Sequence, residues 1–485
     1  MSAYPGERAD EMDQVLRAAH DAAVDWLSGL ETAPVGARSD VVPAATPLPE
    51  EGVGPAAAFA ELVERAQSRA TASTGPRYFH YVLGGVTPAA LAADWLASAL
   101  DQVASSSQGS PLAVDLEELA TGWLVELFEL GQPQDWTGVF TTGATMANFV
   151  CLAAARQWWG EALGVDVAEE GLAGLPRPAV LTSGYVHASV VKSLAMLGIG
   201  RASVERFVAD NRGALDLAAL GARLEELSAE PRDQRGPAIV VATAGEVNAG
   251  AFDPIDALAD LCAKHGAWLH VDGAFGLFAR VSPTARDLCR GVERADSIAT
   301  DMHKWLNVPY DSGAAFVRRR AWLAKSFRMV ADYLPKASSD QVQRRVPANL
   351  GPESSRRARA LPVFATLLSS GRAGVAALVE EHLRLARYLA ERVRECADLE
   401  LLDAPCLNVV PFRLAPPGVR KRDLDALNEA AGARVLAVGD VFVGTTRYRS
   451  RVAFRPAIAN WRTREADLDL LIEAIREAGA FVSSR

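Results

Sequence analysis

Trp268-Leu-His-Val-Asp-Gly-Ala-Phe-Gly276 is followed by Ala295-Asp-Ser-Ile-Ala-Thr-Asp-Met-His-Lys-Trp-Leu306 and by Ser312-Gly-Ala-Ala-Phe-Val317. These three apolar runs, each bounded by polar residues, predict three short strands, of which the first spans residues 267–271. The first run delivers Asp272 at its carboxyl end, where the small Gly273 and Ala274 would let a flat group lie close to the backbone. The second delivers Lys304. We therefore expect an acid and a lysine at the ends of neighbouring strands.

A strand-end aspartate and a lysine suit a pyridoxal phosphate cofactor. A lysine amine forms an imine with the aldehyde of this cofactor, and an aspartate keeps the pyridine nitrogen protonated, so that the ring takes up electrons. We therefore predict that Lys304 and Asp272 are both catalytic and cofactor-binding.

The motifs around these two residues, His270-Val-Asp-Gly-Ala274 and Asp301-Met-His-Lys-Trp305, resemble those of the group II pyridoxal-phosphate decarboxylases. This is the family of aromatic-amino-acid and glutamate decarboxylases. The resemblance implies a fold type I, aspartate aminotransferase-like α/β enzyme with a mostly parallel central sheet and helices on both faces. It further implies an N-terminal helical arm (1–84) that wraps a partner subunit, a large cofactor domain (85–345) and a small C-terminal α/β domain (346–485).

Bulk composition agrees with a large intracellular enzyme. The chain has 485 residues, of which 49% are hydrophobic and 23% charged, which is ordinary for a soluble globular protein. A formal net charge of −10 argues against a nucleic-acid partner, which needs a basic face. The five cysteines are scattered without metal-type spacing, so we expect a reduced, cytoplasmic protein without a metal. No apolar run approaches ~18 residues, so we expect no membrane insertion.

Helical and strand patterns extend along the rest of the chain. Alternating strands and helices are expected from about residue 85 to 330. Helices are predicted at about 7–30, 54–70, 87–102, 115–129, 146–159, 422–431 and 465–478, and further strands at 399–402, 408–414 and 452–455. The long polar segment 336–357 is typical of a mobile lid.

A phosphate site is predicted where a strand passes directly into a helix, at Thr141-Thr-Gly-Ala-Thr145. Free backbone N–H groups and the positive end of the helix would face an anion there. On its own this pattern fits a simple helix cap better, and it is Lys304 downstream that favours the phosphate site. By resemblance, Gly143, Ala144 and Thr145 would bind the phosphate.

Other site residues follow from the resemblance. His187 would stack on the pyridine ring and is counted as catalytic with His303, and Thr243 would bond near the ring. The remaining predicted cofactor contacts are Ala274, Thr300, Asp301 and His303. The chain departs from the family at Glu246, which stands where a threonine is common; a carboxylate there would either select a substrate or be solvated.

The predicted substrate pocket contains Phe79, Tyr81, Pro111 and Trp305. These residues favour an aromatic amino acid, although aromatic side chains commonly just fill a core. The resemblance places such pockets at the interface of a homodimer.

The reaction expected is decarboxylation of an L-amino acid to an amine and CO2. The family often uses a tyrosine of the mobile loop to protonate Cα, but no tyrosine or histidine lies between Leu334 and Glu381. Oxidative decarboxylation–deamination to an aldehyde, transamination and retro-aldol cleavage therefore stay open. A non-catalytic dimeric scaffold is the alternative from another class, but the presence of Lys304 and Asp272 argues against it.

Overall fold

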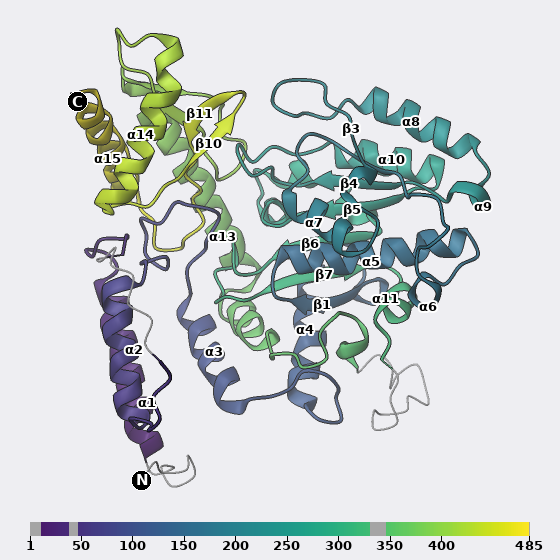
Figure 1. The fold of residues 1–485 in the computed structure, drawn as a ribbon, viewed down its shortest axis with the longest axis horizontal. Helices are drawn as coiled ribbons and strands as arrows, with labels where there is room; N and C mark the ends of the chain where they lie inside the picture. Colours follow the sequence, from purple (N-terminus) through teal and green to yellow (C-terminus); the bar gives the residue numbers. More distant parts are fainter. Residues whose placement is uncertain (1–10, 38–46, 330–345, 485) are drawn as a thin grey trace.

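A computed structural model describes residues 11–37, 47–329 and 346–484. Its centre is a seven-stranded sheet with the order β1-β7-β6-β5-β4-β2-β3 (Figure 1). The strands are β1 (Thr137–Thr141), β2 (Val180–Thr182), β3 (Val204–Arg206), β4 (Ile239–Thr243), β5 (Trp268–Asp272), β6 (Ser297–Asp301) and β7 (Gly313–Val317). Strands β3, β2, β4, β5 and β6 run parallel, whereas β7 is antiparallel to both of its neighbours. The prediction of a mostly parallel sheet is confirmed.

Helices cover both faces of this sheet, as predicted. One face carries α5 (Ala144–Ala162), α7 (Ala188–Met196) and α11 (Arg320–Phe327), which bury one apolar cluster against the strands. The opposite face carries α4 (Pro111–Leu127), α8 (Leu217–Ala229), α10 (Ile255–His265) and the first half of α13 (Ala360–Glu395). Side chains alternate along a strand, so Trp268 of β5 joins the first cluster and Leu269 the second.

A smaller antiparallel sheet with the order β10-β11-β9-β8 forms a second core with α14 (Leu424–Val438) and α15 (Glu465–Ser483). Its strands are β8 (Leu399–Leu401), β9 (Phe412–Leu414), β10 (Thr445–Tyr448) and β11 (Arg451–Phe454). The strand predicted at 408–414 is realised only at its end, and β10 was missed because its Thr-Thr-Arg-Tyr sequence is polar. The division at residues 84 and 345 stays a prediction.

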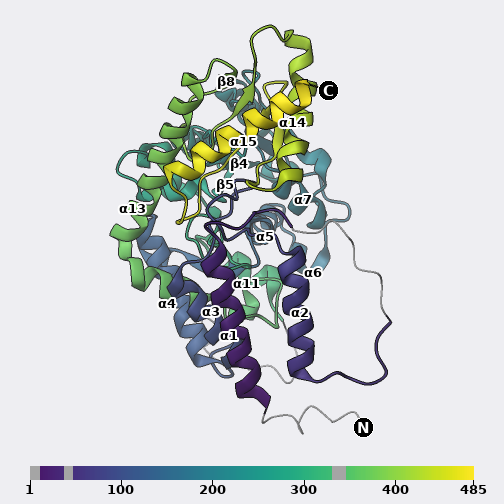
Figure 2. The ribbon, with the colours of Figure 1, turned by 90° about the vertical axis from the view of Figure 1, so that its left-hand side faces the viewer.

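The N-terminal helices α1 (Met12–Gly29) and α2 (Pro55–Arg69) lie side by side and extend away from the body, beyond α3 (Pro88–Leu100) (Figures 1 and 2). Within these two described helices no residue is buried. Apolar side chains recur at helical spacing along both helices, and several of them, such as Leu16 and Leu62, are exposed. The arm therefore presents an apolar surface that this chain does not cover.

The segment predicted as a mobile lid divides into two parts. Its residues 336–345 lie outside the described part of the chain. In the described part, Arg356 makes a buried ion pair with Glu117 of α4, with Nη2 2.7 Å from Oε1 and Nη1 2.9 Å from Oε2. The same guanidinium donates to the carbonyl oxygens of Ala104 and Phe140. Residues around Arg356 are thus fixed to the body, contrary to the prediction for this part of the segment.

Helix α13 is the one helix among the described residues that is long and apolar enough to cross a bilayer. It is broken at Gly371, whose φ of 58° is left-handed, and it packs against α3, α4 and α15. These contacts are those of a core helix. His382 of α13 is buried, accepting a hydrogen bond from Trp305 Nε1 at Nδ1 (2.8 Å) and donating from Nε2 to the Asn460 carbonyl (3.1 Å).

His382 predicts a dependence of stability on pH. Burial lowers the pKa of His382 to about 4, whereas an unfolded histidine has a pKa of about 6.5. Between these values the unfolded chain binds a proton that the folded chain does not, so the free energy of unfolding falls as the pH falls. We expect the free energy of unfolding of the wild type to fall by about 2–3 kcal/mol more than that of His382→Gln when the pH is lowered from about 7 to about 4.5. Urea unfolding at both pH values measures this difference; equal losses would contradict the assignment.

Candidate active site

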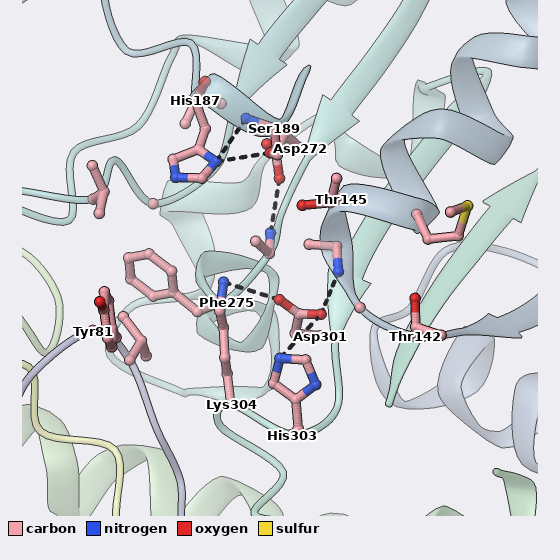
Figure 3. Close-up of a pocket in the computed structure, with 18 of the residues that line it drawn as sticks. Tyr81, Thr142, Thr145, His187, Ser189, Asp272, Phe275, Asp301, His303 and Lys304 are labelled. Carbon is pink, nitrogen blue, oxygen red and sulfur yellow. Dashed lines mark hydrogen bonds and ion pairs between the residues drawn. The ribbon is translucent and has the colours of Figure 1, made fainter. Parts of the chain in front are cut away.

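A cavity of ≈ 390 Å³ lies at the carboxyl ends of β4, β5 and β6 (Figure 3). In open α/β sheets this edge is where ligands bind. Eleven predicted site residues line the cavity: Tyr81, Gly143, Ala144, Thr145, His187, Thr243, Asp272, Ala274, Asp301, His303 and Lys304. Residues far apart in the sequence thus converge on one site.

Lys304 follows β6 and faces the cavity with 22% of its side chain exposed. Its Nζ lies 2.9 Å from Oδ2 of Asp301, the last residue of β6 (Figure 3). The N-terminal segment passes directly over this turn: a Cβ on Gly84 would lie 1.9 Å from the Lys304 carbonyl oxygen. Close backbone contact therefore fixes the base of the lysine.

The start of α5 forms an anion cradle beside Lys304. Ala144, its first residue, donates its N–H to Asp301 Oδ1 at 2.5 Å, so a carboxylate already occupies the positive end of the helix. Gly143 has φ 150°, and a Cβ there would lie 3.1 Å from Cε1 of His303. A Cβ on Gly313 of β7 would lie 2.6 Å from the Gly143 backbone. Glycine at both positions lets the strand and the cradle touch.

Asp272 ends β5 deep in the site, and only 3% of its surface is exposed. Its Oδ2 accepts a hydrogen bond from Asn148 Nδ2 (3.1 Å) and its Oδ1 accepts one from the Ala274 N–H (3.2 Å). Burial raises the pKa of Asp272, while the charges of His187 and Lys304 and these hydrogen bonds lower it. A cationic ring nitrogen placed here would supply the missing counter-charge.

His187 caps the N-terminus of α7 by accepting the Ser189 N–H at Nδ1 (3.2 Å), and Ser189 Oγ lies 2.7 Å from the same nitrogen. Figure 3 shows its ring opposite Asp272 and above Lys304. His303 accepts the Ser312 N–H at Nδ1 (3.2 Å) and stacks on Tyr310 with ring centroids 4.0 Å apart. Burial lowers the pKa of His303, which keeps this ring neutral.

Four predicted residues do not line the cavity. Thr300 lies between Ala299 and Asp301 on β6, so strand alternation turns it to the opposite face. Phe79 belongs to the core of the small sheet, and Trp305 is fully buried with its N–H on His382. Direct substrate contact by Phe79 or Trp305 was therefore wrong for this cavity. Pro111 begins α4 outside the cavity lining, and its role stays a prediction.

Several residues at the cavity were not predicted as site residues. Tyr185, Tyr310 and Phe275 line it. Arg455 follows β11 of the small sheet; it donates from Nη1 to the Tyr81 carbonyl (2.8 Å) and from Nε to the Val247 carbonyl. Its Nη2 is buried without a partner among the described residues, and burial lowers its pKa to about 10. No sequence signal ties Arg455 to the site, because it arrives from a separate sheet.

Glu246 was left open between substrate selection and solvation; its carboxylate is not solvated, and it is not among the residues that line the cavity. It is 5% exposed, and its carboxylate accepts N–H groups of Asn248 and Ala249 within its own loop. Asn248 in turn accepts the hydroxyl of Thr446 in β10 (2.8 Å). Glu246 therefore shapes a loop that joins the two sheets.

Comparison with known proteins places the chain in a family. The model of the pyridoxal-dependent decarboxylase conserved domain matches residues 61–415. The chain belongs to this family. The enzyme is accordingly a pyridoxal-phosphate-dependent decarboxylase of amino acids, and the predicted resemblance is confirmed.

Two curated relatives and one solved structure illustrate the range of the family. The enzyme is 28% identical over 481 residues to an aromatic-L-amino-acid decarboxylase of Bacillus atrophaeus, covering 98% of this chain and 97% of that protein. It is 34% identical over 436 residues to an L-2,4-diaminobutyrate decarboxylase of Rhizobium meliloti (strain 1021), with 89% and 83% covered. The crystal structure of Oryza sativa TDC with PLP and tryptamine superimposes with a TM-score of 0.88 at 27% identity, covering 98% of each chain.

The residues present fit pyridoxal phosphate. The cavity combines an amine on Lys304, a buried carboxylate on Asp272 and the N–H groups that begin α5. The hydroxyl of Thr243, which lines the cavity, is buried without a partner among the described residues. The site thus offers an imine partner, a counter-charge, an anion cradle and an unused hydroxyl.

Proposed function

We propose that the enzyme decarboxylates an aromatic L-amino acid to the corresponding amine and CO2. The observation that carries this proposal is the character of the cavity wall, which combines Tyr81, Phe275, Tyr310 and Val247 with one buried arginine, Arg455. When bound, the cofactor supplies an aldehyde that joins the substrate amine and a protonated ring that takes up electrons from Cα. The protein residues bind and orient the reacting groups.

Several of the predicted cofactor residues have positions that support a role. Lys304 would hold the aldehyde carbon of the cofactor through its Nζ, and Asp272 would accept the ring N–H. The first N–H groups of α5 would hold the phosphate in place of Asp301, and His187 would cover one face of the ring. Lys304 is the better proton donor to Cα, because the Nδ1 of His303 accepts the Ser312 N–H and its Nε2 lies 3.5 Å from Asp301.

Arg455 would bind the α-carboxylate of the substrate. Arg455 lines the cavity together with Tyr81, its buried Nη2 has no partner among the described residues, and a carboxylate is the group that completes a buried guanidinium. A carboxylate held in a fixed orientation by this guanidinium would be positioned to leave as CO2, with the cofactor supplying the electron sink. Arg455 thereby orients the bond to be broken.

The remainder of the cavity favours an aromatic over a cationic side chain. The acidic residues that line it are Asp272 and Asp301, and both already have partners at the cofactor site. Among the described residues, Glu246 is also fully engaged with its own loop. A cationic side chain such as that of 2,4-diaminobutyrate would find no free carboxylate here, whereas an aromatic ring would meet Tyr81 and Phe275.

An acidic amino acid is the second candidate, and Arg455 is the observation that favours it. If Arg455 binds a side-chain carboxylate instead of the α-carboxylate, substrates such as glutamate or cysteine sulfinate would fit. Whether Arg455 binds the α-carboxylate or the side-chain acid of the substrate therefore distinguishes an aromatic from an acidic substrate.

A substrate panel tests the proposal. The cofactor-loaded enzyme is given tryptophan, tyrosine, phenylalanine, glutamate, aspartate, cysteine sulfinate and 2,4-diaminobutyrate, all as L-isomers, and CO2 release is followed. We expect kcat/KM for an aromatic substrate to exceed that for the others at least ~10-fold. Arg455→Lys should lower kcat/KM for every substrate if the arginine holds the α-carboxylate. A loss confined to acidic substrates, together with preference for them, would reject the aromatic assignment.

We also propose that the enzyme is a homodimer whose second copy covers the arm. An apolar hollow of ≈ 730 Å³ lies between α1, α2 and α3, lined by Trp26, Phe59, Leu62 and Trp95. Exposed apolar side chains continue over the adjoining helices at Leu96, Leu100, Leu112 and Leu119. Apolar surface of this extent on a soluble chain marks an interface.

Placing a charge in this hollow should weaken the dimer. Leu62 is 59% exposed in the single chain, so Leu62→Glu should fold but should raise the dissociation constant of the dimer at least ~10-fold. Leu470→Glu on α15, where the leucine is 44% exposed, is the matched control and should leave the dimer intact. Light scattering during gel filtration gives the masses. A monomeric wild type, or equal effects of both variants, would reject this interface.

A further inference from the structure

A row of buried polar side chains leads from the core to the acid of the cofactor site. Trp268, His270 and Asp272 alternate along β5 and therefore share the face that α5 covers. The register of β6 places Ser297 directly beside His270. Asn148 of α5 lies over both strands; none of the five residues is more than 3% exposed. This row was not predicted, because the sequence of β5 was interpreted as a continuous apolar strand.

The directions of the hydrogen bonds follow from Asp272, because an ionised carboxylate only accepts. Asn148 therefore turns its Nδ2 to Asp272 (3.1 Å), which leaves its Oδ1 to accept from His270 Nε2 (2.8 Å). His270 Nδ1 then accepts from the hydroxyl of Ser297 (2.9 Å), and Ser297 Oγ accepts from Trp268 Nε1 (3.0 Å). Burial lowers the pKa of His270 to about 3, so this ring stays neutral.

Asn148 is the branch point of the row. With Oδ1 held by His270, its Nδ2 donates to Asp272 Oδ2 (3.1 Å) and to Ser189 Oγ (3.2 Å). The Ser189 hydroxyl hydrogen is then directed to His187 Nδ1 (2.7 Å), which leaves the His187 hydrogen on Nε2. Donation to Asp272 favours its charged form and opposes the effect of burial. One amide therefore acts on the acid at the edge of the cofactor and on the histidine at its face.

We propose that Asn148, oriented by Trp268, Ser297 and His270, is the positioning residue that keeps Asp272 an ionised acceptor and keeps the Nδ1 of His187 an acceptor from Ser189. Asn148 does not itself line the cavity, so it acts through Asp272 and His187. The inference depends on the cofactor and not on the identity of the substrate.

Asn148→Asp gives this proposal a distinctive pH signature. The introduced carboxyl keeps the shape of Asn148 and still accepts from His270, but its other oxygen faces Asp272. When protonated it can donate its single hydrogen to Asp272; when ionised it repels Asp272, and neighbouring carboxylates hold a shared proton to unusually high pH. The other titratable groups around Asp272 are His187 on α7, Lys304 after β6 and Cys151 on α5, and all three are the same in wild type and variant.

The measurement is the dissociation constant of pyridoxal phosphate, without substrate, from about pH 5.5 to about pH 8.5. We expect the affinity of Asn148→Asp to approach that of wild type at the acidic end and to be about 10- to 100-fold weaker at the basic end. Cys151→Ala, a fully buried change one turn along α5, is the matched control and should follow wild type at every pH. A constant ratio of Asn148→Asp to wild type across this range would overturn the proposal.

Variants of His270 test the orientation of the amide independently of folding at position 148. His270→Gln can still accept from Ser297 and donate to Asn148, whereas His270→Phe can do neither. We expect His270→Gln to bind pyridoxal phosphate within a few-fold of wild type and His270→Phe to bind it about 10-fold more weakly. Thermal unfolding of the apoproteins identifies a variant that is merely unfolded. Equal affinities of two folded His270 variants would overturn the proposed orientation.

Discussion

Lys304→Ala is expected to reduce cofactor-dependent CO2 release by roughly 10³-fold or more, because the variant loses both the imine partner and the proposed proton donor. The fold should survive: the lysine side chain is 22% exposed, and among the described residues it pairs with Asp301. The measurement is kcat on the best substrate at saturating pyridoxal phosphate. Borohydride reduction of the wild type should attach the cofactor to the peptide that contains Lys304.

Lys192→Ala is the control for this experiment, since Lys192 is exposed on α7 and does not line the cavity. It should retain wild-type kcat and the reducible adduct. If Lys304→Ala kept a substantial fraction of activity, or if the adduct mapped to another lysine, the assignment of Lys304 would be wrong.

Arg356→Leu is expected to cost the largest amount of stability, about 3–5 kcal/mol of the free energy of unfolding. The side chains of Arg356 and Glu117 are 2% and 6% exposed, so removing the guanidinium leaves a carboxylate buried without its counter-charge. It also removes the donors to the carbonyl oxygens of Ala104 and Phe140. Urea unfolding followed by circular dichroism measures the loss.

Arg384→Leu provides the comparison at the surface. Arg384 pairs with Glu381 and Glu465, but these side chains are 41–47% exposed, and exposed ion pairs contribute only about 0–1 kcal/mol. The double variant Glu117→Leu/Arg356→Leu should recover part of the loss, since neither charge is then left alone. Similar losses in Arg356→Leu and Arg384→Leu would contradict the importance given to burial.

The central strands could be predicted because buried parallel strands appear as continuous apolar runs. The first run was expected at residues 267–271, and β5 spans Trp268–Asp272. Their carboxyl ends then placed Asp272, Asp301 and Lys304 at one edge of the sheet. The phosphate cradle was also predicted from a short stretch of sequence. A strand followed directly by a helix can be recognised there, and the first N–H groups of such a helix are free to bind an anion.

Contacts between distant segments could not be predicted in this way. Trp305 follows Lys304 directly, yet the turn after β6 buries it against His382 of α13. Arg455 reaches the cavity only because the small sheet packs beside the large one. Asn148 and His270 occur in a helix and a strand that appear apolar, and only the packing of α5 on β5 shows that they meet. The homodimer, the cytoplasmic location and the role of Pro111 stay predictions.

The product of the reaction is the other open point of the sequence analysis. Tyr333, directly before the stretch that lacks tyrosine and histidine, lies outside the described residues, so the structure does not test a proton donor there. In the described part, Lys304 lines the cavity, and its Nζ is the proton donor to Cα that we propose. If it donates the proton efficiently, the amine forms; if not, electrons at Cα remain available to oxygen, and an aldehyde with peroxide results.

The stoichiometry of one reaction therefore tests the account most directly. The cofactor-loaded enzyme is given its best aromatic L-amino acid, and CO2, amine, aldehyde, ammonia, peroxide and dissolved oxygen are measured together. We predict equal amounts of CO2 and amine with no oxygen uptake. Equal amounts of CO2 and aldehyde, with oxygen consumed, would contradict amine formation, and consumption of the substrate without CO2 would contradict decarboxylation itself.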